Sequence, residues 1–174
     1  FGLSVTGLIE KQKLLAKGGM QVGDAIIITK PVGTGTLFAA DMRGKSNVRW
    51  ITSAIESMIQ SNLAAAQCLY KYEVHGCTDV TGFGVLGHLV EMVRAGKVDI
   101  SIDLNKLPIL EGALETMQLG IFSSLQPSNI RLRRAIKNQD IAVIHVLYPL
   151  LFDPQTAGGL LDTIPNQHKD ACVF

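Results

Sequence analysis

The stretch that decides the fold is CTDVTGFGVLGH, residues 77–88. The segment before it, residues 70–75, leads into a β-prone stretch, and apolar residues recur at helical spacing from Val85 to Val93. Gly96 is a typical stop signal for such a helix. We therefore expect a strand, a glycine-containing loop and an α-helix in succession, with Asp79 at the junction.

Asp79 has two possible roles at this junction. Its carboxylate can cap the following helix by accepting backbone N–H groups, which stabilises a helix by about 1 kcal/mol. It can also hold Mg²⁺, which prefers one or two carboxylates together with substrate phosphates. Gly82 and Gly84 favour the second role, because glycines let phosphate oxygens approach backbone N–H groups at a helix N-terminus. The spacing alone leaves both roles open.

Two further loops have a similar composition. KPVGTG, residues 30–35, follows a β-branched run over 25–29 that reads as a buried strand. A strand-ending turn is the simpler interpretation of this loop. DPQTAGG, residues 153–159, is compatible with a turn and also with a loop that faces a nucleotide. The residues themselves do not decide between these two interpretations.

The remaining pattern interleaves strands and helices. A helix is expected over residues 50–66, with Asn62 on its apolar stripe, where a hydrogen bond to a neighbouring loop is a simpler explanation than ligand contact. The other expected elements are a strand over 98–104, a helix over 110–119, a basic helix over 129–137 and a β-prone segment over 141–148. This predicts an α+β fold, a mixed β-sheet with helices packed on it, in one domain spanning residues 1–174.

Composition excludes several classes of protein. The chain has 174 residues, of which 47% are hydrophobic and 18% charged, and its formal net charge is +1. So small a charge gives no general attraction to nucleic acid or to an anionic membrane surface. The apolar runs are too short for a membrane helix, and the first residues lack the charged start and apolar core of a signal peptide.

The chemistry-bearing residues show few standard motifs. The three cysteines, Cys68, Cys77 and Cys172, are an odd number without CxxC spacing, so we expect neither a zinc site nor a disulfide framework, and the cytoplasm is the expected compartment. The four histidines lack ligand-like spacing. Nucleotide-binding and hydrolase motifs of the GxGxxG, GxxxxGK[ST] and GxSxG types are missing from the sequence.

Longer strings carry a resemblance to a known family. KPVGTG, MIQSNLAAA (58–66), CTDVTGFGVLGH and DPQTAGGLL (153–161) occur here in the same order as in selenophosphate synthetases (selenide, water dikinases) of the bacterial type. The wider superfamily includes aminoimidazole ribonucleotide synthetase, thiamine-monophosphate kinase and the hydrogenase-maturation dehydratase, which are similar in layout but differ in these strings. The chain thus resembles the C-terminal domain of a selenophosphate synthetase.

The resemblance implies specific site residues. Asp79 matches a magnesium ligand of the family, and Thr78, Thr81, Gly82 and Gly84 match positions that line the ATP cleft. The reactive cysteine or selenocysteine and the lysine of the family belong to an N-terminal domain that nothing here matches. We therefore expect no catalytic residue in this chain, and the fragment alone is expected to be inactive. The family pattern is also cut short after Leu161.

The resemblance further implies the whole protein's reaction and partners. Selenide, ATP and water would give selenophosphate, AMP and phosphate, with Mg²⁺ as cofactor and a homodimer formed mainly through the N-terminal half. That half would cover an apolar face of this domain, which the isolated chain is expected to bury by self-association. Two other classes stay open: a sister ATP-dependent enzyme and a non-catalytic interaction domain.

Overall fold

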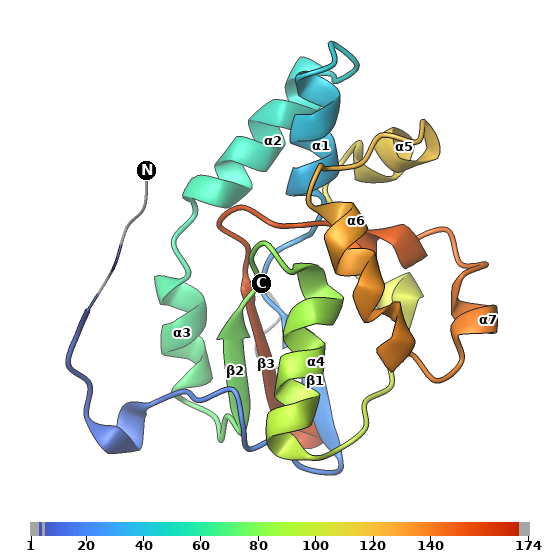
Figure 1. The fold of residues 1–174 in the computed structure, drawn as a ribbon. Helices are drawn as coiled ribbons and strands as arrows, with labels where there is room; N and C mark the ends of the chain where they lie inside the picture. Colours follow the sequence, from blue (N-terminus) through green and yellow to red (C-terminus); the bar gives the residue numbers. More distant parts are fainter. Residues whose placement is uncertain (1–3, 5, 171–174) are drawn as a thin grey trace.

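The core of the protein is a three-stranded sheet, shown in Figure 1 by a computed structural model that describes residues 4 and 6–170. Its strands are β1 (Asp24–Ile28), β2 (Gly76–Asp79) and β3 (Leu160–Pro165). The order is β1-β3-β2, and both pairings are antiparallel. The α+β class is therefore confirmed. A mixed sheet also requires parallel pairing, and within the described residues this is limited to one isolated bridge between Val32 and Ile109.

Helices cover both faces of this sheet. Alternate residues of the strands point to opposite faces. On one face, Leu161 packs with Val85 and Leu89 of α4 (Gly84–Gly96). On the other face, Ile164 and Cys77 pack with Leu69 of α3 (Leu63–Leu69). The consecutive apolar residues Ala25–Ile28 of β1 are explained by this packing on both sides.

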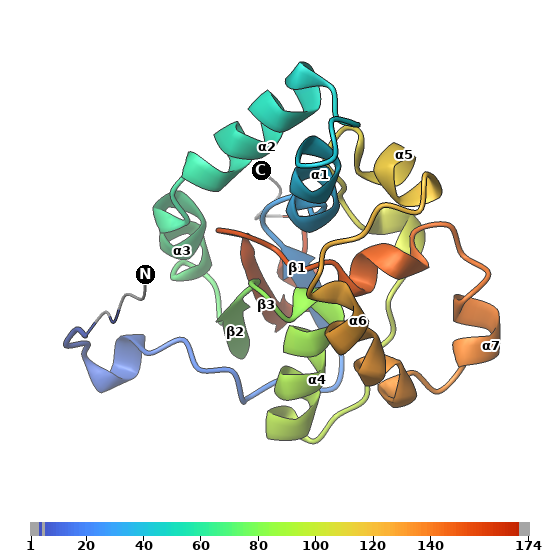
Figure 2. The same cartoon turned by 45° about the horizontal axis from the view of Figure 1, so that its top comes forward.

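A second, smaller core lies beyond one end of the sheet. It is built by α1 (Thr34–Asp41), α2 (Val48–Ile59) and α5 (Ala113–Gln118), which Figure 2 shows grouped above the strands. Leu37, Ala54 and Leu150 are completely buried there. The other helical elements are η1 (Lys11–Lys13), η2 (Leu104–Lys106), α6 (Gln126–Asn129), η3 (Ile130–Ala135), α7 (Gln139–Ala142), η4 (Tyr148–Phe152) and η5 (Asn166–His168).

The helix predicted over 50–66 is broken into α2 and α3. Gln60 ends α2 with an extended backbone, at φ −62° and ψ 120°. Its carbonyl, which would accept a hydrogen bond from Ala64 in a continuous helix, instead accepts one from the Lys30 ammonium at 2.6 Å. A contact between residues 30 positions apart thus ends the helix, and local periodicity carries no sign of it.

Two strand predictions are wrong. Residues 98–104 run irregularly, because Val98 and Ile100 pack on the α4 core without joining the ladder, and Asp103 caps the 3-10 turn that follows. Residues 141–148 form the end of α7, turns and the start of η4. Only Leu147 and Tyr148 of this segment are buried, whereas Ile141, Val143, Ile144 and Val146 are exposed, so its apolar content does not mark a buried strand. The basic helix expected over 129–137 is a 3-10 helix over Ile130–Ala135.

Within the described residues, no helix is long and apolar enough to cross a membrane.

Asp162 is a buried carboxyl at the centre of the sheet. It pairs with Ile27 on one side and Cys77 on the other. Its side chain is fully buried, and neither carboxyl oxygen has a hydrogen-bond partner within the described residues. Burial raises the pKa of Asp162 to about 7, and burial together with Asp162 and Asp79 raises the pKa of the Cys77 thiol to about 12. The sheet therefore holds Asp162 most easily as the neutral acid.

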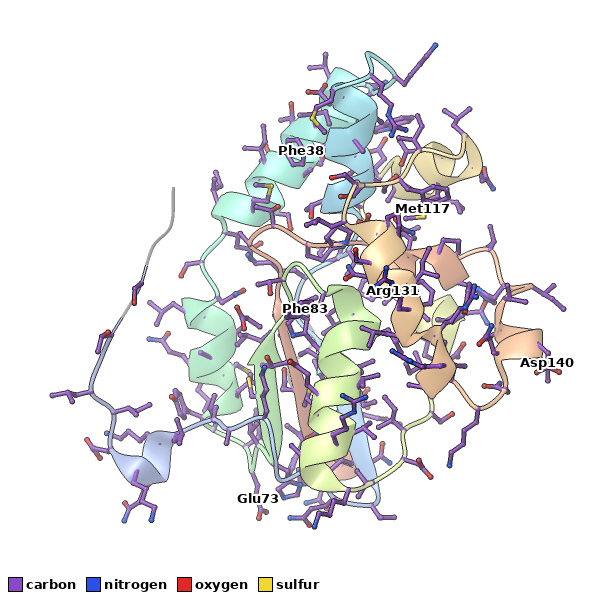
Figure 3. The ribbon with its side chains drawn as sticks, viewed as in Figure 1. Phe38, Glu73, Phe83, Met117, Arg131 and Asp140 are labelled. Carbon is purple, nitrogen blue, oxygen red and sulfur yellow. The ribbon has the colours of Figure 1, made fainter. Side chains whose placement is uncertain are left out.

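We predict that Asp162 makes the protein less stable as the pH rises. The folded chain keeps this proton up to about pH 7, whereas the unfolded chain releases it near the ordinary pKa of 3.8, so stability falls between those values. Asp162→Asn should remove this dependence and, at pH 8, raise the free energy of unfolding by about 1–3 kcal/mol. Thermal unfolding at pH 5 and pH 8 measures both effects. Asp140→Asn, at an exposed position on α7 (Figure 3), is the control, and an equal pH response of the two variants would contradict the prediction.

Candidate functional site

Three loops meet at one end of the sheet. β1 and β2 end where β3 begins, since Ile28 pairs with Leu161 and Asp79 with Leu160. The segments that follow β1 and β2 and the segment that precedes β3 are therefore neighbours. They are residues 29–35, 80–84 and 153–159, the glycine-containing loops singled out in the sequence. In Figures 1 and 2 the last of these passes between the helical cluster and the strand ends.

The side chain of Gln155 joins the first loop to the third. Its Oε1 accepts hydrogen bonds from the N–H groups of Gly33 and Thr34, at 2.9 and 3.2 Å, and from the Thr34 hydroxyl at 3.2 Å. Its Nε2 donates to the carbonyl and to Oδ2 of Asp153, at 2.8 and 3.0 Å. Gln155 is only 4% exposed, so these bonds form away from water. The amide thus fixes both loops in one arrangement.

Asp153 is the second buried group of this junction. Its Oδ2 accepts a hydrogen bond from Gly35 N–H at 3.1 Å, while Oδ1 has no partner within the described residues. Burial raises the pKa of Asp153 to about 7, although the bonds from Gln155, Gly35 and Thr36 oppose this shift. Gly35 is required here because a β-carbon would lie 2.6 Å from Asp153 Oδ1. Asp153 therefore acts as an internal brace between loops.

The second loop is tied to the third by its backbone. Gln155 N–H donates to the Thr81 carbonyl at 3.0 Å, and Val80 N–H donates to the Gly159 carbonyl at 2.9 Å. Gly84 has φ +70°, and a β-carbon there would lie 2.9 Å from the Leu151 carbonyl oxygen. Only glycine fits this close approach without strain. All three loops are thereby held as one unit.

Asp79 lies at the exposed rim of this unit. Within the described residues no hydrogen bond or ion pair reaches its carboxylate, and the N-cap residue of α4 is Phe83, which provides no side-chain cap. The capping role left open by the sequence is thus not the one this structure shows. The described residues contain no group of three or more His, Cys, Asp or Glu side chains arranged for a metal ion. Asp79 can offer a cation one ligand, and the rest must come from a ligand or from outside the described residues.

The other predicted site residues lie close to Asp79 but face inward. Thr78 is buried, and its hydroxyl contacts the Asp79 carbonyl at 3.3 Å. Thr81 donates its backbone N–H to Nε2 of His88 at 3.0 Å, so this histidine nitrogen acts as the acceptor. Burial lowers the pKa of His88, which keeps the ring neutral for this role although Glu91 opposes the shift. Gly82 is half-buried, and its carbonyl accepts a hydrogen bond from Asn129 at 2.8 Å.

Lys30 and Asn62 hold the third loop from behind. The Lys30 ammonium donates to the carbonyls of Gln60 and Ala157, at 2.6 and 3.1 Å, and Asn62 Nδ2 donates to the Gly158 carbonyl at 3.0 Å. The hydrogen bond expected from Asn62 to a neighbouring loop is therefore confirmed. The sequence analysis did not predict that the Lys30 side chain holds this loop. The signal for it was the position of a lysine between a buried strand and a proline, where a charged side chain needs a specific partner.

This arrangement matches a known family. Residues 21–171 match the family model described as AIR synthase related protein, C-terminal domain. The chain belongs to this family. It is 39% identical over 177 residues to a selenide, water dikinase of Clostridioides difficile strain 630, covering 99% of this chain and 50% of that protein. It is also 39% identical over 168 residues to the selenide, water dikinase of Pelobacter propionicus, covering 96% and 48%. The chain spans about half the length of these relatives.

Solved structures confirm the fold of the AIR synthase related family. The hydrogenase maturation protein HypE aligns with a TM-score of 0.62 at 16% identity, covering 91% of this chain and 40% of that one. Thiamine-monophosphate kinase from Stenotrophomonas maltophilia aligns with a TM-score of 0.61 at 16% identity, covering 94% and 46%. The resemblance in the sequence motifs to selenophosphate synthetases, and the AIR-synthase-like fold it implied, are confirmed by these matches.

We predict that Gln155→Leu destabilises the protein by about 2–4 kcal/mol, because leucine leaves the buried N–H groups of Gly33 and Thr34 without an acceptor. Thermal unfolding measures the change. Gln118→Leu, at an exposed position on α5, is the matched control and should shift the midpoint by less than about a quarter as much. Equal stability of the two variants would show that the Gln155 bonds do not hold the loops.

Proposed function

We propose that this chain is the C-terminal domain of a selenide, water dikinase, which converts selenide, ATP and water to selenophosphate, AMP and phosphate. The observation that carries this proposal is the convergence of the three glycine-containing loops at one end of the sheet, with the exposed carboxylate of Asp79 at their rim. Relatives named selenide, water dikinase at 39% identity support the reaction class over that of the sister enzymes, whose solved structures are only 16% identical.

The loops would bind the phosphates of ATP. Gly82 has open space where a β-carbon would lie and would leave room for phosphate oxygens next to the N-terminal end of α4, whereas the same space at Gly84 is filled by the Leu151 carbonyl and Gly84 serves to pack the loops together. Thr78 and Thr81 would shape this part of the cleft and offer the phosphates no free backbone donor, since Thr78 is buried in the sheet and the Thr81 N–H is bonded to His88. The ATP-bound structure of HypE supports a nucleotide role for this fold, at a TM-score of 0.56.

Asp79 would hold the magnesium ion. The donor chemistry fits, because Mg²⁺ takes one or two carboxylates and completes its shell with phosphates and water. When bound, the ion supplies charge neutralisation of the triphosphate. Asp79 would orient it at the rim of the loops, and the described residues contain no group of three or more His, Cys, Asp or Glu side chains to hold it without a ligand.

The other half of the polypeptide would complete the site. The relatives are twice as long as this chain, and the reactive cysteine or selenocysteine and the lysine would come from their additional N-terminal domain. Pairing of two full-length chains through that domain and a cytoplasmic location are part of the same proposal. In this division of labour the present chain binds nucleotide and metal, and contributes no group that forms or breaks a bond.

We predict that this chain alone forms no AMP from ATP and selenide, and that a full-length protein containing it does. In the full-length protein, Asp79→Asn should lower ATP turnover at least about a hundredfold, since a neutral amide is a poor magnesium ligand. The thermal midpoint should change little, because nothing in the fold depends on this carboxylate. AMP release and thermal unfolding are measured side by side.

Asp140→Asn in the same protein is the control and should retain full turnover. Selenide-dependent AMP formation by the isolated chain would refute the division of labour. Full activity of Asp79→Asn would refute the magnesium assignment.

This chain also presents an exposed apolar surface that the N-terminal domain would cover. Ile55 and Ile59 on α2 and Leu63 at the start of α3 are 44%, 78% and 62% exposed, and they recur every four residues across the break between the two helices. Contiguous apolar patches of this kind on a monomer mark interaction surfaces. We propose that the N-terminal domain packs on this face in the full-length protein.

We predict that the isolated chain self-associates through this face. Ile55→Lys combined with Ile59→Lys should shift the chain toward monomer in light scattering at high concentration, because the lysines remove apolar area and add repulsion. Ile144→Lys, at an exposed position beyond α7, should leave the association unchanged. A wild-type chain that stays monomeric throughout would refute the prediction.

A further inference from the structure

The third loop contains an unusual arch at residues 157–159. Its three carbonyls are all engaged from within the protein: that of Ala157 by the Lys30 ammonium, that of Gly158 by Asn62, and that of Gly159 by Val80 N–H. The N–H groups of the same three residues donate no hydrogen bond within the described part of the chain. The carbonyls of the arch thus have hydrogen-bond partners, and its N–H groups have none within the described residues.

The direction of these groups follows from peptide geometry. In a trans peptide the C=O and N–H bonds point in opposite directions. The peptide groups that join Ala157 to Gly158 and Gly158 to Gly159 turn their carbonyls toward Lys30 and Asn62, so the N–H groups of Gly158 and Gly159 point away from those side chains. Successive N–H groups on one side of a turn form a concave site for an anion.

The sequence of the arch keeps this side open. Ala157 has φ +49°, which reverses the chain at that point. A β-carbon on Gly158 would lie 2.2 Å from the Val80 carbonyl oxygen, and one on Gly159 would lie 2.5 Å from the backbone nitrogen of Lys30. Both glycines are therefore required by close packing on the inner side. Thr156 and Ala157 are exposed, Gly158 is half-buried and Gly159 is buried, so solvent reaches the arch from its Ala157 end.

A second observation, the charge of Lys30 behind the arch, points to an anionic ligand. Lys30 is only 5% exposed, and none of the ion pairs among the described residues involves it. Burial lowers the pKa of its ammonium, and no neighbouring carboxylate opposes that shift. A buried cation without a counter-charge is costly, and a bound anion would offset that cost. The charge lies directly behind the arch, to which the ammonium is bonded.

We propose that Ala157–Gly159 is an oxyanion subsite for a phosphoryl group, and that Lys30 is its positioning residue, which orients the arch and supplies positive charge from behind. Asn62 assists by holding the next carbonyl in the same direction. The subsite stands on the geometry of this chain, and only the identity of its natural ligand, a phosphate of the nucleotide or a phosphate product, rests on the proposed function.

The test is a titration of the ¹⁵N-labelled chain with sodium tripolyphosphate, followed by NMR. We expect saturable shifts of the amide signals of Ala157, Gly158 and Gly159, and no such shifts with adenosine. Orthophosphate that shifts the same signals as strongly indicates a subsite for a single free phosphate, whereas a clear preference for tripolyphosphate indicates the phosphate chain of a nucleotide. Absence of saturable shifts with both anions overturns the proposal.

Variants separate the role of Lys30 from general electrostatic attraction. Lys30→Met keeps the apolar stem and should weaken tripolyphosphate binding about tenfold, the loss typical of one charge-assisted contact. Lys45→Met, at an exposed position, removes the same formal charge and should leave the affinity unchanged. Equal affinity of Lys30→Met and wild type overturns the positioning role.

Asn62→Ala keeps the test decisive if Lys30→Met does not fold. It removes only the bond to the Gly158 carbonyl, and should weaken binding about threefold with the shifts confined to the arch. Unchanged binding would contradict the proposed orientation of the arch. A full-length protein that lacks selenide-dependent ATP turnover, although the arch binds tripolyphosphate, would refute the proposed function and leave the subsite intact.

Discussion

The structure depends most on the buried amide of Gln155. Both ends of this side chain are used, one as acceptor for Gly33 and Thr34 and the other as donor to Asp153. Because the group is shielded from water, loss of either set of bonds would leave polar groups unpaired in the interior. These bonds fix the relative position of the first and third loops. Backbone hydrogen bonds to the third loop then fix the position of the second loop. The exposed position of Asp79 and the open side of the arch are consequences of this bracing.

Local sequence patterns were sufficient to predict the type and bounds of an element where its side chains are buried at regular spacing. The strand over 25–29 and the helix after Gly84 appear within a residue or two of their predicted positions, since a β-branched run and a helical apolar stripe are each compatible with one structure here. Residues 98–104 and 141–148 show why the same reasoning fails elsewhere. Val98, Ile100 and Leu104 pack on the α4 core without a strand partner, while Ile141, Val143, Ile144 and Val146 are exposed. Apolar alternation alone reveals neither whether a pairing partner exists nor whether the side chains are buried.

The candidate site was predictable in its location and less so in its details. The three loops could be recognised from their glycines and polar residues, and Asp79 from its place between strand and helix. The inward orientation of Thr78, and the roles of Lys30 and Gln155, could not be recognised, because their partners lie as far as 127 residues away along the chain. The break between α2 and α3 belongs to the same class, since it follows from the capture of a carbonyl by Lys30.

The strand order has a consequence for how the molecule is assembled. β3, the last strand along the chain, occupies the centre of the sheet, and β1 and β2 make no ladder with each other. β1 and β2 therefore have no partner strand until residues 160–165 have been synthesised. The pairing of β1 with β3 closes a loop of more than 130 residues. Non-local pairing of this kind slows folding and prolongs the exposure of strand edges. During synthesis, α4 and its flanking segments are the part of the chain that can form early, and the sheet is the part that must form last.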